Sequence, residues 1–211
     1  SLFRGMTMAA TSVTLYATAA IAYRDQTGDS LSVRQAASGE SRLGVKGQED
    51  LGNGTAAFFQ LESRYDLDTG ANTGTAAGTG FFDEKAVVGL SFANGAHKVY
   101  FGKSASPIDR LGNNIGHLAN DFGVKTSMGG WRNGAFYDYN ANGLAVAAAV
   151  TTKGGAYSPN TANVTEGGKD TKSSYGISAR YDAANWYFGA GWQADNDKTP
   201  AKDSSSSVTG S

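Results

Sequence analysis

Residues 41–70, SRLGVKGQEDLGNGTAAFFQLESRYDLDTG, alternate polar and apolar side chains on both sides of a short Asn-Gly turn. Charged or amide residues fill one set of alternate positions, namely Arg42, Lys46, Gln60, Glu62, Arg64 and Asp66. Apolar residues fill the other set, namely Leu43, Val45, Phe59, Leu61, Tyr65 and Leu67. A period of two puts the two sets on opposite faces of a strand, whereas a helix would scatter them. The stretch therefore predicts a β-hairpin with one polar and one apolar face.

The composition of the whole chain also favours an all-β fold. Its 211 residues include 29 glycines but only 3 prolines, and 40% are apolar, which is enough to bury a core. Such a chain forms many short extended segments joined by tight turns. The net charge of −1 gives no basic footprint of a nucleic-acid binder. Because there is no cysteine, disulfides and thiolate metal sites are excluded.

Nine segments have the pattern of strands, and their connections alternate in length. The expected strands cover residues 12–24, 41–49, 55–68, 82–92, 96–103, 130–140, 143–153, 172–182 and 185–195. Short connections such as 50–54 and 140–143 carry the Asn-Gly pair of hairpin turns. Long polar connections lie between them, so one end of the sheet is expected to carry tight turns and the other long loops. The longest apolar run, 144–150, is far too short for a membrane helix.

The alternation fits two architectures. A soluble sandwich would pack its apolar face on a second sheet, and a transmembrane barrel would turn that face to lipid. Aromatic residues such as Tyr65, Tyr181 and Trp192 cluster toward strand ends on the apolar face, as in the girdles of membrane barrels. The polar face also holds many small residues, which suit a lumen. The pattern therefore favours a transmembrane antiparallel β-barrel.

Several segments resemble the general porins of Gram-negative outer membranes. The quoted hairpin is similar to the second and third strands of that family, and SVTLY (12–16) to the first. VYFGKSASPID (99–109) is similar to the fifth strand with the entry to the constriction loop, loop 3, expected at about 104–130. The resemblance implies a 16-stranded trimeric barrel in the outer membrane. Its water-filled channel would carry ions and small hydrophilic solutes passively, without a cofactor.

The chain departs from the family pattern in charge and in length. Glu84 stands near a position that is usually Arg, so the basic wall of the pore is expected to be thinned. A closed barrel of this kind needs on the order of 320 residues. We therefore expect the chain to be the N-terminal portion of a longer porin rather than a small complete barrel. Residues 1–11 would form a disordered or processed lead, residues 12–195 the barrel, and residues 196–211 a polar extracellular loop.

Charged residues with lumen parity are the candidate pore site. Arg42 matches the second-strand arginine of the family that projects into the constriction, although it could instead be a wall residue paired with Glu62 or Asp66. The other candidate basic residues are Lys46, Arg64, Lys85, Arg132 and Arg180. Asp109 and Asp121 in loop 3 are candidate acidic groups opposite the basic wall, or simply caps of local turns. Selectivity would follow from the sign and placement of these charges.

Other functions receive little support. His97 and His117 have no companion ligands of the kind that bind metal, and no segment resembles a nucleophile elbow, so neither a metal site nor an enzyme is expected. The partners expected are ions, small hydrophilic solutes, outer-membrane lipid and two further copies of the chain. Two alternatives to a general diffusion porin stay open. One is a porin specific for one solute, and the other is a plugged barrel with a structural or adhesive role.

Overall fold

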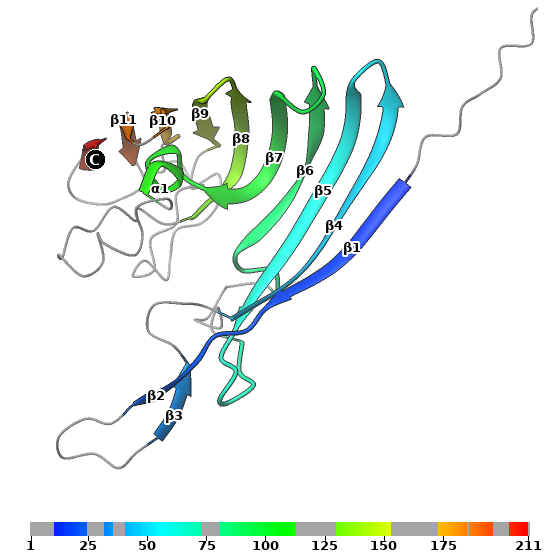
Figure 1. Cartoon of the computed structure of the whole chain (residues 1–211), viewed down its shortest axis with the longest axis vertical. Coiled ribbons are helices and arrows are strands. Elements are labelled where there is room, and N and C mark those ends of the chain that lie inside the picture. Colours follow the sequence, from blue (N-terminus) through cyan, green and yellow to red (C-terminus); the bar gives the residue numbers. More distant parts are fainter. Residues whose placement is uncertain are drawn as a thin grey trace, which may run out of the picture.

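The computed structural model describes residues 11–24, 32–35, 41–72, 81–112, 130–152, 173–184, 186–195 and 203–210. Within them, ten strands form one antiparallel sheet in the order β1-β4-β5-β6-β7-β8-β9-β10-β11-β12. These strands are β1 (Thr11–Thr18), β4 (Ser41–Gly52), β5 (Thr55–Tyr65), β6 (Lys85–Phe92), β7 (His97–Ala105), β8 (Gly130–Ala141), β9 (Leu144–Thr151), β10 (Tyr175–Asp182), β11 (Tyr187–Asp195) and β12 (Asp203–Gly210). The sheet is open and curved, with β1 and β12 at its two edges (Figure 1). One short helix, α1 (Pro107–Gly112), follows β7, and no helix among the described residues is long and apolar enough to cross a membrane.

The all-β prediction is confirmed, but the first expected strand is broken. β1 ends at Thr18, and the chain then enters a separate hairpin of β2 (Ile21–Arg24) and β3 (Ser32–Gln35), which extends away from the main sheet (Figure 1). At the break, the Ala20 amide donates a hydrogen bond of 3.0 Å to Ser41 Oγ at the start of β4. This bond replaces a ladder bond there, so the chain can leave the sheet.

The C-terminal segment also differs from its prediction. Residues 196–211 were expected to form a polar loop, but Asp203–Gly210 pairs along β11 in antiparallel register. Its sequence, DSSSSVTG, has no alternation of apolar and polar residues and so gives no periodic signal of a strand. Pairing is possible nevertheless because ladder hydrogen bonds join backbone groups and do not depend on the side chains. The expected lead at residues 1–11 lies outside the described residues except for Thr11, which begins β1.

Tight turns join the strands at one end of the sheet, which we call the turn end; the opposite end is the loop end. Asn53 and Gly54 join β4 to β5 with φ of 53° and 71°, and Asn142 and Gly143 join β8 to β9 with φ of 54° and 78°. Two consecutive residues with positive φ match the twist of a hairpin, and Asn and Gly adopt this conformation at low cost. The turn chemistry therefore fixes the pairing of neighbouring strands in these hairpins.

The two faces of the sheet have opposite character. On the face that we call outer, large apolar side chains are exposed: Leu15 is 74% exposed, Val88 61% and Phe101 57%. On the inner face, polar side chains such as those of Glu62, Ser178 and Gln193 are buried. This is the reverse of the usual arrangement in water, where large exposed apolar patches are rare. The distribution fits a sheet whose outer face meets an apolar environment.

α1 packs on the inner face of β9, β10 and β11. Ser178 Oγ donates a hydrogen bond of 2.7 Å to the Pro107 carbonyl, and the Ile108 amide donates one of 3.3 Å to Gln193 Oε1. The Leu111 side chain lies against Gly189, where a Cβ would come within 2.6 Å of Leu111 Cδ1. The start of the segment that is expected to form loop 3 is thus bound to the inner face of the sheet. Residues 113–129 of that loop lie outside the described residues.

Candidate functional site

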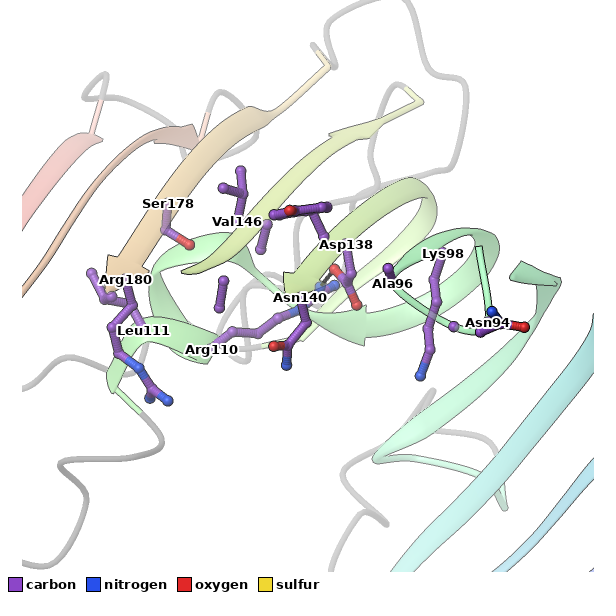
Figure 2. A pocket seen from close by; sticks show the side chains of 14 residues that line it. Asn94, Ala96, Lys98, Arg110, Leu111, Asp138, Asn140, Val146, Ser178 and Arg180 are labelled. Carbon is purple, nitrogen blue, oxygen red and sulfur yellow. Dashed lines mark hydrogen bonds and ion pairs between the residues drawn. The ribbon is translucent and has the colours of Figure 1, made fainter. Parts of the chain in front are cut away.

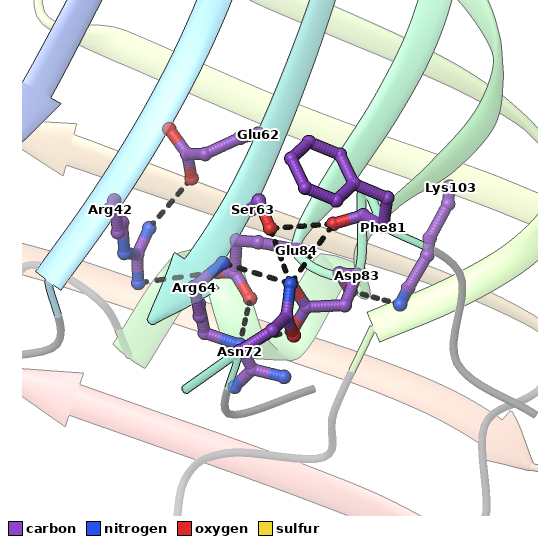
Figure 3. Close-up of polar contacts among 9 residues, drawn as sticks. All are labelled: Arg42, Glu62, Ser63, Arg64, Asn72, Phe81, Asp83, Glu84 and Lys103. Atoms are coloured by element: carbon purple, nitrogen blue, oxygen red, sulfur yellow. Dashed lines mark hydrogen bonds and ion pairs between the residues drawn. The ribbon is translucent and has the colours of Figure 1, made fainter. Parts of the chain in front are cut away.

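Five charged residues meet on the inner face near the loop end of β4, β5 and β6, and we call them the arginine cluster: Arg42, Glu62, Arg64, Asp83 and Glu84 (Figure 3). Arg42 Nη1 lies 3.1 Å from Glu62 Oε1, and Arg42 Nη2 lies 3.2 Å from Glu84 Oε1. Arg64 Nε lies 2.8 Å from Asp83 Oδ2 and 3.3 Å from Glu84 Oε2. Glu84 therefore bridges two arginines that belong to neighbouring strands.

The strand register explains why this bridge is needed. Arg42 and Arg64 are direct cross-strand partners, so two like charges lie side by side. Such a pair destabilises a sheet unless opposite charges compensate it. Glu84 contacts both guanidinium groups, while Glu62 and Asp83 each bind one of them. The cluster is thus a local network in which each arginine has two carboxylate partners.

The segment before β6 is held in place by several hydrogen bonds. Ser63 Oγ donates to the Phe81 carbonyl at 2.5 Å, and Asn72 Nδ2 donates to Ser63 Oγ at 2.7 Å. The Arg64 amide donates to Asp83 Oδ1 at 2.8 Å, and Lys103 Nζ donates to the Asp83 carbonyl. The Asp83 side chain is fully buried, with its charge compensated by Arg64. These contacts position Asp83 and Glu84 beside the arginines.

Tyr16 extends the network to β1. Its hydroxyl donates to Glu62 Oε2 at 2.6 Å and accepts from Gln60 Nε2 at 2.7 Å. Its ring covers Gly44, because a Cβ on that glycine would overlap the ring. An aromatic ring laid over a strand glycine restores contacts that the missing side chain cannot make. Glu62 is therefore held from both sides, by Arg42 and by Tyr16.

The predicted basic residues are only partly brought together. Arg42 and Arg64 meet in the cluster, Lys85 is the cross-strand partner of Glu62, and the ammonium of Lys46 lies 5.5 Å from the centre of the Tyr16 ring. Arg132 lies on β8 and is half-buried. Arg180 lies on β10, where its Nη2 binds Asp182 Oδ2 at 2.8 Å.

Of the two predicted acidic residues of loop 3, Asp109 and Asp121, the structure describes only Asp109. Asp109 is in α1, where its amide donates to Ser106 Oγ at 3.3 Å, so Ser106 caps this turn. Asp121 lies outside the described residues. Whether either carboxylate faces the arginines therefore stays a prediction.

Another ion pair outside the arginine cluster, between Arg110 of α1 and Asp138 of β8, was not predicted from the sequence. The guanidinium carbon of Arg110 also lies 5.4 Å from the centre of the Tyr100 ring and 5.3 Å from that of Phe136. Arg110 Nε donates to the Ala105 carbonyl at 3.1 Å. These contacts join loop 3 to the sheet across 28 residues of sequence, a separation at which no periodic signal operates.

The arrangement can present charge to a solute. Among the described residues, no group of three His, Cys, Asp or Glu side chains could hold a metal ion. The charged groups lie instead along one face of a sheet whose other face is apolar. A curved antiparallel sheet with a charged inner face, an exposed apolar outer face and a loop bound inside defines the wall of a transmembrane β-barrel of the porin class.

Comparisons with known proteins agree with this class. The chain belongs to the Gram-negative porin family, whose sequence profile matches residues 2–211. A comparison with curated proteins found no significant match. Among solved structures, the anion-selective porin from Comamonas acidovorans is similar, with a TM-score of 0.60 and 20% sequence identity. The match covers 94% of this chain but 62% of that porin, so the chain spans less than two thirds of its length.

Proposed function

We propose that the full-length protein is a diffusion porin of the Gram-negative outer membrane. Its barrel encloses a water-filled channel, and ions and small hydrophilic solutes cross it passively. The observation that carries this proposal is the reversed distribution of side chains, with exposed Val, Leu and Phe outside and a charged, hydrogen-bonded network inside. Porins have the same alternation of lipid-facing and lumen-facing residues.

We further propose that the protein works as a homotrimer and that its selectivity is weak. The arginine cluster contains two arginines and three carboxylates, and Lys85 and Lys103 lie beside it. Four cations against three carboxylates leave a charge of only 4 − 3 = +1. The similar solved porin is described as anion-selective. A residual positive charge supports a preference for anions in this protein too, but a weaker one than in a strongly anion-selective porin.

Single-channel recording from the full-length protein tests the proposal. Purified protein whose heat-modifiable mobility on gels shows that it is folded is added to planar bilayers in KCl. We expect stepwise, voltage-linear conductance and, in a salt gradient, a small reversal potential of the sign that indicates chloride preference. Bilayers that stay silent with folded protein would reject the diffusion porin and favour the plugged barrel.

Solute specificity is the second candidate. It is favoured by α1, which binds to the inner wall through Ser178, Gln193 and Gly189 and so narrows the space inside the barrel. Saturable block of the chloride current by one class of solute would distinguish a specific porin from a general one.

A further inference from the structure

A pocket of about 490 Å³ lies between α1 and the turn end of β7 to β10 (Figure 2). Its volume is in the range of small-molecule sites. The residues that line it are Asn94, Gly95, Ala96, Lys98, Arg110, Leu111, Asp138, Tyr139, Asn140, Ala145, Val146, Ala147, Ser178 and Arg180. Small alanines on β9 leave the space open, and polar side chains surround it.

The pocket is distant from the arginine cluster along the strands. Lys98 is the cross-strand partner of Ser91, which is in turn the partner of Ala56 on β5. Ala56 and Arg64 are eight residues apart on that strand (64 − 56), which is roughly 26 Å in extended chain. A solute in the pocket therefore meets charges other than those of the cluster.

The charge of the lining is positive. Three cations, Lys98, Arg110 and Arg180, face a single lining carboxylate, that of Asp138. Both oxygens of Asp138 are already occupied, since Oδ1 binds Arg110 Nη1 and Oδ2 accepts from the Tyr100 hydroxyl at 3.0 Å. The Asp138 carboxylate therefore already interacts with Arg110 and Tyr100 through its two oxygens.

The three cations differ in how far they are neutralised. Arg110 is paired with Asp138, and Arg180 with Asp182, which lies beside the pocket. Lys98 is exposed, and among the described residues its ammonium pairs with no carboxylate. It lies 5.8 Å from the centre of the Phe58 ring, a contact that holds the side chain on the inner face. Lys98 therefore supplies the charge that a ligand can neutralise.

We propose that this pocket binds a small oxyanion, either a phosphate or a carboxylate, on the turn side of α1. Lys98 supplies the charge-assisted hydrogen bond, the amides of Asn94 and Asn140 supply further donors, and the paired arginines add a positive field. This inference rests on the proposed function insofar as the solute reaches the pocket through the channel. The pocket would then be an anion-binding subsite that is separate from the arginine cluster.

Calorimetric titration of the folded full-length protein in detergent tests the subsite without requiring conduction. Inorganic phosphate and succinate are titrated separately at low ionic strength, because salt screens such contacts. We expect saturable binding of at least one of them, and Lys98→Gln to weaken it about tenfold, the usual effect of losing one charged hydrogen bond. The two probes show whether the phosphate or the carboxylate is the better ligand.

Lys46→Gln is the matched control. Lys46 also lies over an aromatic ring on the inner face, at 5.5 Å from the centre of Tyr16, but it does not line the pocket. Its substitution removes the same charge from the inner face outside the pocket, so it should weaken binding clearly less than Lys98→Gln does. Equal weakening by the two variants, or no binding of either probe to the unaltered protein, would overturn the subsite.

Chloride conductance of the same preparations separates this inference from the proposed function. Conducting channels with titrations that Lys98→Gln does not change would reject the subsite and leave the porin intact. Silent bilayers with binding that depends on Lys98 would reject the channel and leave the subsite intact.

Discussion

Glu84 is the residue that most directly sets the charge of the inner wall. It binds both Arg42 and Arg64, and its side chain is 27% exposed, so its field reaches the solvent inside the barrel. A unit charge acting through water over about 10 Å contributes about 0.4 kcal/mol, which changes an ion population about twofold. Removing this negative charge raises the chloride population and lowers the potassium population, each about twofold. We therefore expect Glu84→Gln to raise the chloride-to-potassium permeability ratio of the full-length porin about fourfold, measured as a shift in reversal potential.

Two companion variants make this prediction specific. Glu49→Gln removes the same charge from an exposed position of opposite parity on β4, so the reversal potential should not move. Arg42→Ala removes a cation from the cluster and should shift the reversal potential toward cations. If Glu49→Gln and Glu84→Gln gave the same shift, the effect would come from overall charge and not from the inner wall.

At the scale of the elements, α1 packs closely on β11 because β11 has a glycine, Gly189, at the point of contact. A Cβ at Gly189 would come within 2.6 Å of Leu111 Cδ1, and the Leu111 side chain is buried. Overpacking of this kind costs about 1–3 kcal/mol. We expect Gly189→Ala to lower the free energy of unfolding by such an amount, measured by urea titration of tryptophan fluorescence.

A double mutant identifies the cause of that loss. Leu111→Ala removes the clashing methyl groups, so adding it to Gly189→Ala should cost less than the sum of the two single variants. Gly130→Ala is the control, because its added Cβ would have no neighbour closer than 3.7 Å and should change stability by less than about 0.5 kcal/mol. Strict additivity of Gly189→Ala and Leu111→Ala would show that α1 does not rest on β11 in the folded protein.

Some of these elements and contacts can be predicted from the sequence, and others cannot. The alternation in residues 41–70 predicts the β4–β5 hairpin and its two faces, because both follow from local periodicity and register. The pairing of Arg42 with Glu62 was only one of two alternatives to a constriction role for Arg42, the other being a pairing with Asp66. The contact of Arg110 with Asp138 could not be predicted in this way, since it depends on where loop 3 folds. β12 was missed because its run of serines carries no apolar period. The local sequence pattern thus predicts the strands of the sheet. The contacts of the segment that packs on the inner face of the sheet depend on long-range packing.

On the scale of the whole sheet, one cross-strand row displays the apolar outer face from β1 to β11. Successive partners in the register are Val13, Gly47, Phe59, Val88, Phe101, Ala135, Val150, Tyr175 and Ala194. The neighbouring row on the inner face has polar residues at its ends and apolar residues in its middle, namely Ser12, Gln48, Phe58, Gly89, Tyr100, Phe136, Ala149, Gly176 and Gln193. Tyr100, Phe136 and Ala149 in this row are buried. A continuous apolar row as long as the outer one is not expected on a sheet face that is exposed to water. It is the expected surface toward lipid or toward another subunit.

This organisation predicts that the cost of a charge depends on the face that receives it. Val13 is 65% exposed on the outer face, and its neighbour Ser12 is exposed on the inner face at nearly the same depth. In the full-length protein folded into phospholipid vesicles, we expect Val13→Lys to lower the free energy of unfolding by about 2–4 kcal/mol and Ser12→Lys by less than about 1 kcal/mol. Equal costs for the two lysines would mean that both faces meet water, and the membrane orientation inferred for this sheet would then be wrong.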